Sequence, residues 1–171
     1  MNDLRSDPTL LTPIGLALGK HVADLIDKQD LLKMQLILGH TETFLNHSPW
    51  LPNNVKHALQ IELGGLYFHI GFYHKAQQVL EESIAALENK TPRNEAAIAR
   101  GLGYLGSVHR WLGNYDKSNQ LLEQSLAIYQ KQDPQDHDRI AWVFVLLGQV
   151  SRELAHYDNA RDFFERGLAI Y

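Results

Sequence analysis

Histidine is the residue type in this sequence best suited to hold a metal ion, and the chain has nine of them. A helix presents two histidines to one ion when they lie four residues apart, and metalloproteases use the pattern HExxH. The closest pairs here, His69 with His74 and His40 with His47, are five and seven residues apart. HExxH does not occur in the sequence. We therefore predict no metal site.

Two further patterns could support catalysis, and neither is complete. The segment from Gly15 to His21 resembles a phosphate-binding loop, but it has one residue too few between its glycines. His21 also stands where serine or threonine would hold magnesium. No serine lies in the strand–turn–helix context of a nucleophile elbow. The sequence thus predicts neither catalytic residues nor a cofactor, and we expect a protein that is not an enzyme.

Arginine and tryptophan residues are suited to a different task, which is the binding of a partner molecule. Guanidinium groups bind carboxylates through two parallel hydrogen bonds, and large aromatic side chains supply contact area. The residues of these types in the second half of the chain include Arg100, Arg110, Arg152, Trp111 and Trp142. Whether they act together depends on the elements that position them.

The composition limits the class of protein. The 171 residues are 44% hydrophobic and 21% charged, which is close to the average of folded soluble proteins. The net charge of -4 makes nucleic acid an unfavourable partner, and the absence of cysteine excludes disulfides and thiolate metal sites. The charged N-terminal residues do not form a signal peptide, and no apolar run is long enough to span a membrane. We expect a cytoplasmic protein.

An internal repeat organises the second two-thirds of the chain. Gly64, Gly106 and Gly148 lie 42 residues apart, and a leucine precedes each of them. Other columns keep the same step without insertion or deletion. They are Gly71, Gly113 and Ala155; Tyr73, Tyr115 and Tyr157; Ala76, Ser118 and Ala160; Leu80, Leu122 and Phe164; and Ser83, Ser125 and Gly167.

Each unit is predicted to be a helix, a tight turn and a second helix. In the middle unit the apolar row of Leu102, Leu105 and His109 recurs at helical spacing and resumes after the turn. Gly113 can adopt the left-handed conformation that ends a helix, and Asn114 or Asp116 can cap the next one. The helix glycines cost roughly 1 kcal/mol each relative to alanine, so we expect them to mark close helix crossings.

These residues resemble the tetratricopeptide repeat family, with its leucine–glycine pair in the first helix and its glycine-x-tyrosine turn. The period of 42 exceeds the common period of about 34, which is similar to the long-repeat branch found in kinesin light chains and in arrays attached to signalling NTPases. The resemblance implies an all-α, right-handed superhelical solenoid of antiparallel helix pairs, with about eight helices.

The predicted organisation has five parts. A flexible N-terminus covers residues 1–8, and a degenerate helix pair that caps the array covers residues 9–52. The repeat units cover residues 53–92, 93–134 and 135–171. The first segment contains two apolar rows at helical spacing: Leu11, Ile14, Leu18, Val22, Leu25 and Ile26; then Leu31, Leu32, Leu36, Phe44 and Leu45.

In the tetratricopeptide family the first helix of each pair lines a concave groove that binds a partner's peptide or helix, and this gives the expected site. Its residues are Phe68, His69, Arg100, Ser107, Arg110, Trp111, Trp142, Gln149 and Arg152. Arginines beside aromatic rings suit a protein partner with acidic and apolar side chains. In the competing interpretation the arginines are solvated surface residues and the tryptophans pack between neighbouring units.

The resemblance implies a non-catalytic scaffold for protein–protein interaction. Two alternatives remain open. The chain could be a sensor or autoinhibitory segment of a larger signalling ATPase, or it could self-assemble through its last helix. The apolar residues Phe163, Phe164, Leu168 and Tyr171 have no capping helix after them in the sequence, which motivates the second alternative and a homo-oligomer.

Overall fold

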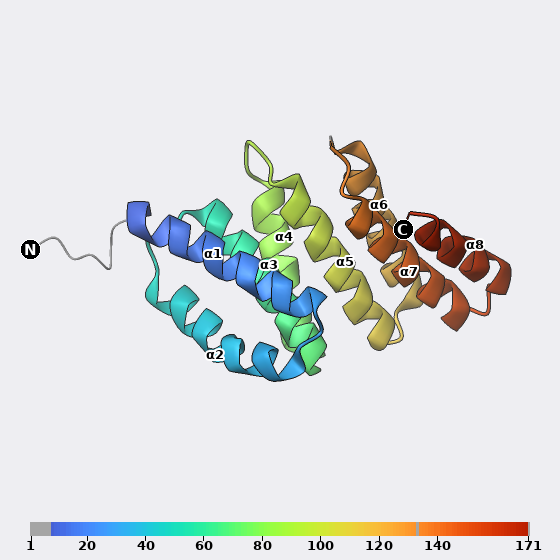
Figure 1. Cartoon of the computed structure of the whole chain (residues 1–171), viewed down its shortest axis with the longest axis horizontal. Helices are drawn as coiled ribbons and strands as arrows, with labels where there is room; N and C mark the ends of the chain where they lie inside the picture. Colours follow the sequence, from blue (N-terminus) through green and yellow to red (C-terminus); the bar gives the residue numbers. More distant parts are fainter. Residues whose placement is uncertain (1–7, 133, 171) are drawn as a thin grey trace, which may run out of the picture. The chain divides into compact units, whose positions relative to one another are not determined.

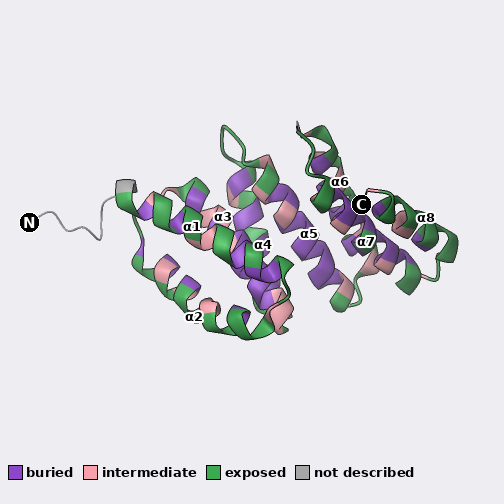
Figure 2. Ribbon diagram, viewed as in Figure 1, coloured by how far each residue is buried: buried purple, intermediate pink, exposed green. Residues whose placement is uncertain are grey.

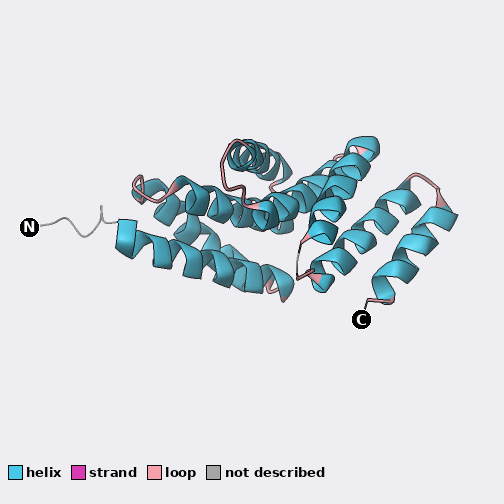
Figure 3. Ribbon diagram, turned by 90° about the horizontal axis from the view of Figure 1, so that it is seen from above, coloured by secondary structure: helices cyan, strands magenta, loops and turns pink. Residues whose placement is uncertain are grey.

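The computed structural model describes residues 8–132 and 134–170, and these residues form eight α-helices and no strand (Figures 1 and 3). The helices are α1 (Pro8–Asp27), α2 (Leu31–His47), α3 (Asn53–Ile70), α4 (Tyr73–Glu88), α5 (Glu95–Trp111), α6 (Tyr115–Lys131), α7 (His137–Glu153) and α8 (Tyr157–Leu168). The prediction of an all-α fold is confirmed. In this part of the chain, none of the helices combines the length and the apolar character needed to cross a lipid bilayer.

Some predictions fall on residues outside the described part. They concern residues 1–7 of the expected flexible N-terminus, Asp133 in the break before α7, and Tyr171 of the apolar C-terminal face. Pro8, which was expected in the flexible segment, is the first residue of α1. The division into one degenerate pair and three repeat units remains a prediction.

The chain divides into two compact units, residues 1–94 and 95–171. The second unit contains two helix pairs, α5 with α6 and α7 with α8, and α6 also packs against α7. Figure 2 shows buried residues running along α5 and α7. The predicted apolar row of Leu102, Leu105 and His109 is buried, as are Leu122 and Tyr129 of α6. Within each helix these positions lie three, four or seven residues apart, so they share one side of their helix.

A glycine lies at the crossing of each regular helix pair. A Cβ atom at Gly106 would lie 2.8 Å from Cδ2 and Cγ of the buried Leu122, a separation that real side chains essentially never adopt. The same contact recurs between Gly64 and Leu80 and between Gly148 and Phe164, with the nearest atoms at 2.6 Å. The predicted close approach is confirmed, and each glycine makes room for a large apolar side chain of the second helix.

Buried serines tie α6 to α5 at two points. The Ser118 hydroxyl donates to the carbonyl oxygen of Gly106 at 2.7 Å, and the Ser125 hydroxyl donates to that of Ala99 at 2.7 Å. A buried hydroxyl needs a partner, and a small side chain lets the two backbones come within reach of such a bond. The small residues of the second helix therefore face the first helix, as expected.

The turns within the pairs use left-handed backbone conformations. Gly71, Gly113 and Ala155 have φ values of +92°, +78° and +59°, so the predicted conformation of Gly113 is confirmed. Of the two predicted capping residues, Asn114 occupies the N-cap position of α6, but its side chain makes no capping bond, and its amide nitrogen lies 3.4 Å from Nδ1 of His109. Asp116 lies in the first turn of α6, where its charge favours the helix N-terminus.

The first unit combines one regular pair, α3 with α4, with a less regular N-terminal part. α1 packs more extensively against α3 than against α2, and α2 also packs against α3. The Tyr67 hydroxyl of α3 donates a hydrogen bond to the Glu42 carboxylate of α2. Burial raises the pKa of Tyr67, and this bond raises it further, so the hydroxyl keeps its proton. The bond holds α2 to α3 by a polar link.

The predicted apolar row of α2 is wrong in most positions. Leu31, Leu32 and Leu36 are exposed and Phe44 is half-buried, so Leu45 is the one buried member of that row. The face that α2 buries consists of Met34, Thr41 and Leu45. Thr41 can be buried because its hydroxyl donates to the carbonyl of Ile37 in its own helix at 3.0 Å. In α1, Ile14 is likewise exposed.

Candidate functional site

Four of the predicted site residues line one open cleft of about 450 Å³ in the second unit. The lining consists of Arg110, Trp111, Tyr115, Gln149, Arg152 and Glu153. The cleft lies where the last turn of α5, the first residue of α6 and the last turns of α7 meet. Trp111 is 57% exposed there, which is unusual for so large an apolar side chain.

Local backbone structure explains why these side chains converge. α5 ends at Trp111, and the left-handed conformation of Gly113 reverses the chain so that α6 begins with Tyr115. Arg110 and Arg152 stand in the last turns of α5 and α7. A helix C-terminus carries partial negative charge, so each cation is favoured by about 0.3 to 1 kcal/mol.

The guanidinium groups of Arg110 and Arg152 lie near an aromatic ring and a carboxylate, respectively. The guanidinium carbon of Arg110 lies 5.4 Å from the centre of the Trp111 ring. Arg152 forms an ion pair with Glu153 at 3.5 Å, and both side chains are exposed to water. Exposed pairs of this kind contribute about 0 to 1 kcal/mol. A carboxylate with better geometry could therefore displace Glu153 from Arg152 at little cost.

Three other predicted residues of this unit pack inside it. Ser107 is buried, and its hydroxyl donates to the carbonyl of Gly103 in its own helix at 3.0 Å. Trp142 is half-buried, and its ring lies 5.5 Å from that of Tyr104 in an edge-to-face arrangement. A Cβ atom at Gly103 would lie 2.4 Å from the Trp142 ring, so the tryptophan fills the space above that glycine.

Arg100 is the third of these packed residues, and it is half-buried. It lies beside Tyr129 of α6. Burial raises the pKa of Tyr129 to about 12, and the nearby charge and hydrogen bond of Arg100 act in the opposite direction. Arg100, Ser107 and Trp142 are not among the residues that line the cleft.

Phe68 and His69 belong to the first unit and stand in the last turn of α3. Both are half-buried, and their rings make an edge-to-face contact at 5.1 Å. Burial lowers the pKa of His69, and the negative charge of Asp27 opposes this effect. His69 is therefore uncharged at neutral pH and adds no positive charge to a site.

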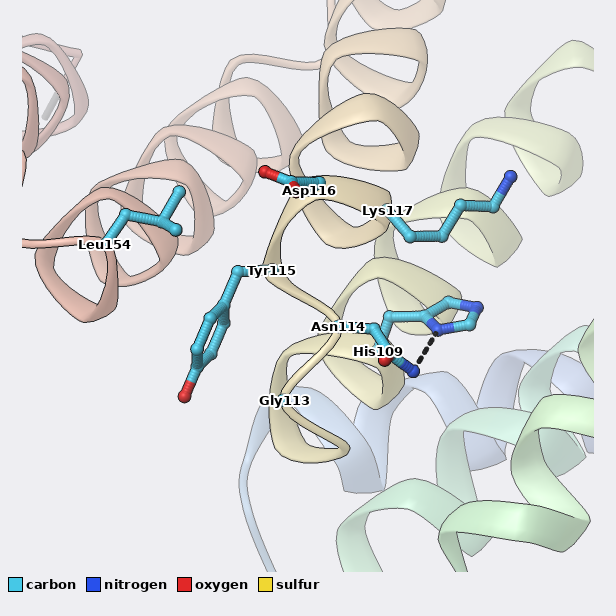
Figure 4. Close-up of a pocket in the computed structure, with 7 residues that line it drawn as sticks. All are labelled: His109, Gly113, Asn114, Tyr115, Asp116, Lys117 and Leu154. Atoms are coloured by element: carbon cyan, nitrogen blue, oxygen red, sulfur yellow. Dashed lines mark hydrogen bonds between the residues drawn. The ribbon is translucent and has the colours of Figure 1, made fainter.

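A second cleft of about 460 Å³ surrounds the turn between α5 and α6 (Figure 4). His109, Asn114 and Lys117 lie on one side of this turn, while Tyr115 and Leu154 lie on the other. Tyr115 lines both clefts. Sequence reasoning did not select it as a site residue, although the repeated glycine-x-tyrosine turn places it two residues after Gly113, at the start of the second helix.

In residues 8–132 and 134–170, no group of three or more histidine and carboxylate side chains has the arrangement of a metal site.

Comparison with known proteins finds one family model that matches part of the chain. Residues 97–171, less than half of the chain, match the family model of the tetratricopeptide repeat. No curated protein matches the sequence.

Solved structures with this fold are also similar. One is BtubC (BKLC) from P. vanneervenii, with a TM-score of 0.58 and 14% sequence identity over 85% of this chain. Another is the apo form of RapI, with a TM-score of 0.62 and 16% identity over 94% of this chain. This chain spans 56% of the first protein and 43% of the second. At such identities the likeness shows the fold alone.

Proposed function

We propose that this chain is a non-catalytic protein-interaction module of the long-repeat tetratricopeptide type. Its second unit binds an extended peptide that carries acidic and apolar side chains, and the site is the cleft lined by Arg110, Trp111, Tyr115, Gln149 and Arg152. The observation that carries the proposal is that the exposed Trp111 lines one open cleft together with the cationic side chains of Arg110 and Arg152.

The cleft suits a peptide better than a small molecule or a nucleic acid. It is open to solvent and lined by both polar and aromatic groups, whereas small-molecule sites enclose most of their ligand. Trp111 and Tyr115 offer contact area for an apolar side chain, and Gln149 can both donate to and accept from a peptide backbone. The net charge of -4 opposes a polyanion, whereas two arginines are enough for one or two carboxylates.

The first experiment selects peptides from a random library displayed on phage and measures the Kd of synthetic copies. Selected peptides should combine aspartate or glutamate with an aromatic or aliphatic residue. Arg110→Glu with Arg152→Glu should weaken binding at least about tenfold, equivalent to about 1.4 kcal/mol. Trp111→Ala should weaken it as well. Higher salt should weaken binding to the unchanged protein, because the cleft is open to solvent.

A matched control changes the same number of charges elsewhere. Lys90→Glu with Lys131→Glu alters two exposed lysines, one in the loop after α4 and one at the opposite end of α6 from Tyr115. This variant should bind the selected peptides as the unchanged protein does. Equal binding by both double variants would exclude the cleft as the site.

A further inference from the structure

Glu153 brings a negative charge into the lining of the cleft at Arg110. The other residues of this lining are Arg110, Trp111, Tyr115, Gln149 and Arg152. The Glu153 side chain is 37% exposed, and its Oε1 atom lies 3.5 Å from Nη2 of Arg152. The cleft therefore presents two cations and one anion to a ligand.

The internal repeat places Glu153 at the position that Trp111 occupies in the preceding unit. The two residues are 42 positions apart, each is the last residue of its helix, and each follows an arginine. The guanidinium group of Arg110 lies over the Trp111 ring, whereas that of Arg152 pairs with Glu153. Equivalent places thus supply the cleft with an apolar contact surface at Trp111 and with a hydrogen-bond acceptor at Glu153.

The stability of α7 does not explain a glutamate at this position. Glu153 is the last residue of α7, and the partial negative charge of a helix C-terminus disfavours a carboxylate there. The ion pair with Arg152 joins sequence neighbours, which do not face each other on a helix, and exposed pairs contribute little stability. A neutral side chain would suit the helix better, which indicates that the charge of Glu153 serves binding.

A ligand carboxylate bound to Arg152 changes the surroundings of Glu153. The guanidinium group then directs its donors to the ligand, and Glu153 is left beside a second negative charge. The two carboxylates repel each other, and water in the open cleft reduces this repulsion without removing it. A ligand that also supplies a cation to Glu153 avoids the repulsion and gains a second ion pair.

We infer that the bound peptide carries a lysine or arginine whose charged group contacts Glu153, beside the carboxylate that Arg152 binds. This inference rests on the proposed function and specifies its partner, which combines acidic, basic and apolar side chains. Side chains of an extended peptide alternate between two sides, so residues two positions apart point the same way. The basic residue should therefore lie two positions from the acidic one.

Selection from the phage-displayed random library tests the composition of the peptide. Peptides selected on the unchanged protein should carry lysine or arginine two positions from aspartate or glutamate. Selection on Glu153→Lys should replace that basic residue by aspartate or glutamate, because the charge that it meets is reversed.

A double-mutant cycle measures the contact itself. Fluorescence anisotropy gives the Kd of one selected synthetic peptide and of a copy in which glutamine replaces the basic residue. On the unchanged protein this replacement should weaken binding about three- to fivefold, as expected for an exposed ion pair. On Glu153→Gln the same replacement should have no effect, because the contact is already lost.

Glu88→Gln is the matched control. Glu88 is the last residue of α4, is exposed, and pairs with Arg93 at 3.8 Å, outside the cleft. The peptide replacement should weaken binding to this variant by the same factor as to the unchanged protein. Circular dichroism should show the same helix content for both glutamine variants.

Two results would overturn the inference: selected peptides that lack a basic residue, or a peptide replacement that has the same effect on the unchanged protein and on Glu153→Gln. The double variant Arg110→Glu with Arg152→Glu separates this failure from that of the proposed function. Weak binding by the double variant, together with no coupling at Glu153, means that the peptide site is correct and the role of Glu153 is wrong. Unchanged binding by the double variant means that both are wrong.

Discussion

Ala155 occupies a backbone conformation that the two earlier turns assign to glycine. Its φ of +59° is positive, like the +92° of Gly71 and the +78° of Gly113. A residue with a Cβ atom, such as alanine, is disfavoured in this left-handed region. The third turn thus keeps the left-handed conformation of the other two even though Ala155 is less suited to it than glycine. The turn geometry comes from the flanking helices and not from this residue alone.

Exchange of alanine and glycine at these turns should have opposite effects. Ala155→Gly should raise the free energy of unfolding by about 1 kcal/mol, because it relieves the left-handed strain. Gly113→Ala should lower it by about the same amount, since a Cβ at Gly113 meets no described atom within 4 Å and only the backbone is affected. Thermal denaturation should show shifts of about 2 to 4 °C per kcal/mol. A destabilised Ala155→Gly would contradict this account.

At the scale of elements, the helix glycines decide how closely the two helices of a pair approach. Gly106 accommodates Leu122, and the same contact recurs at Gly64 and Gly148. The hydroxyls of Ser118 and Ser125 reach the α5 backbone across the same crossing. The cost of glycine inside a helix, roughly 1 kcal/mol, is offset by these contacts.

Alanine at two helix glycines separates packing from helix propensity. Gly106→Ala should lower the free energy of unfolding by about 1 kcal/mol, because overpacking of about 1 to 3 kcal/mol exceeds the gain in helix propensity. Gly39→Ala is the control, since that position in α2 is open, and it should raise stability by about 0.5 to 1 kcal/mol. Urea denaturation measures both. The crossing is misassigned if Gly106→Ala is as stable as the unchanged protein.

At the scale of the whole molecule, the chain forms two compact units that meet in sequence between residues 94 and 95. The segment 89–94, between the end of α4 and the start of α5, is exposed throughout. Exposed polar segments are preferred sites of proteolysis, because the backbone can enter a protease without disrupting a core.

Among the trypsin sites of residues 8–132 and 134–170, limited digestion should therefore cut first after Lys90 or Arg93, which lie in that segment. The expected products end or begin near residues 90 to 94, as mass spectrometry would show. A variant with Lys90→Gln and Arg93→Gln should be digested more slowly. Early cuts inside α5 or α6 would instead mean that the second unit is less stable than its packing indicates.

The candidate site was only partly predictable. The period of 42 correctly placed Arg110, Trp111, Gln149 and Arg152 near one another, because positions at equal offsets in the repeats stand at equal places in their helices. It could not separate them from Ser107, which shares the offset of Gln149, or from Arg100 and Trp142, which share another offset of the predicted groove. These three residues pack inside the unit. Tyr115 lines the cleft because the turn at Gly113 places the start of α6 beside the end of α5.

The sequence by itself determined the helical fold, the turns and the glycine crossings, since these depend on residue spacing and local conformation. Only the tertiary structure decided which face each helix buries. Four leucines of α2 were expected inside, yet of these α2 buries Leu45 alone, together with Met34 and Thr41. The physical reason is that a helix with apolar residues on two sides has no preferred inner face until a neighbour packs against one of them. In α2 that neighbour is α3, and the bond between Tyr67 and Glu42 links the two helices.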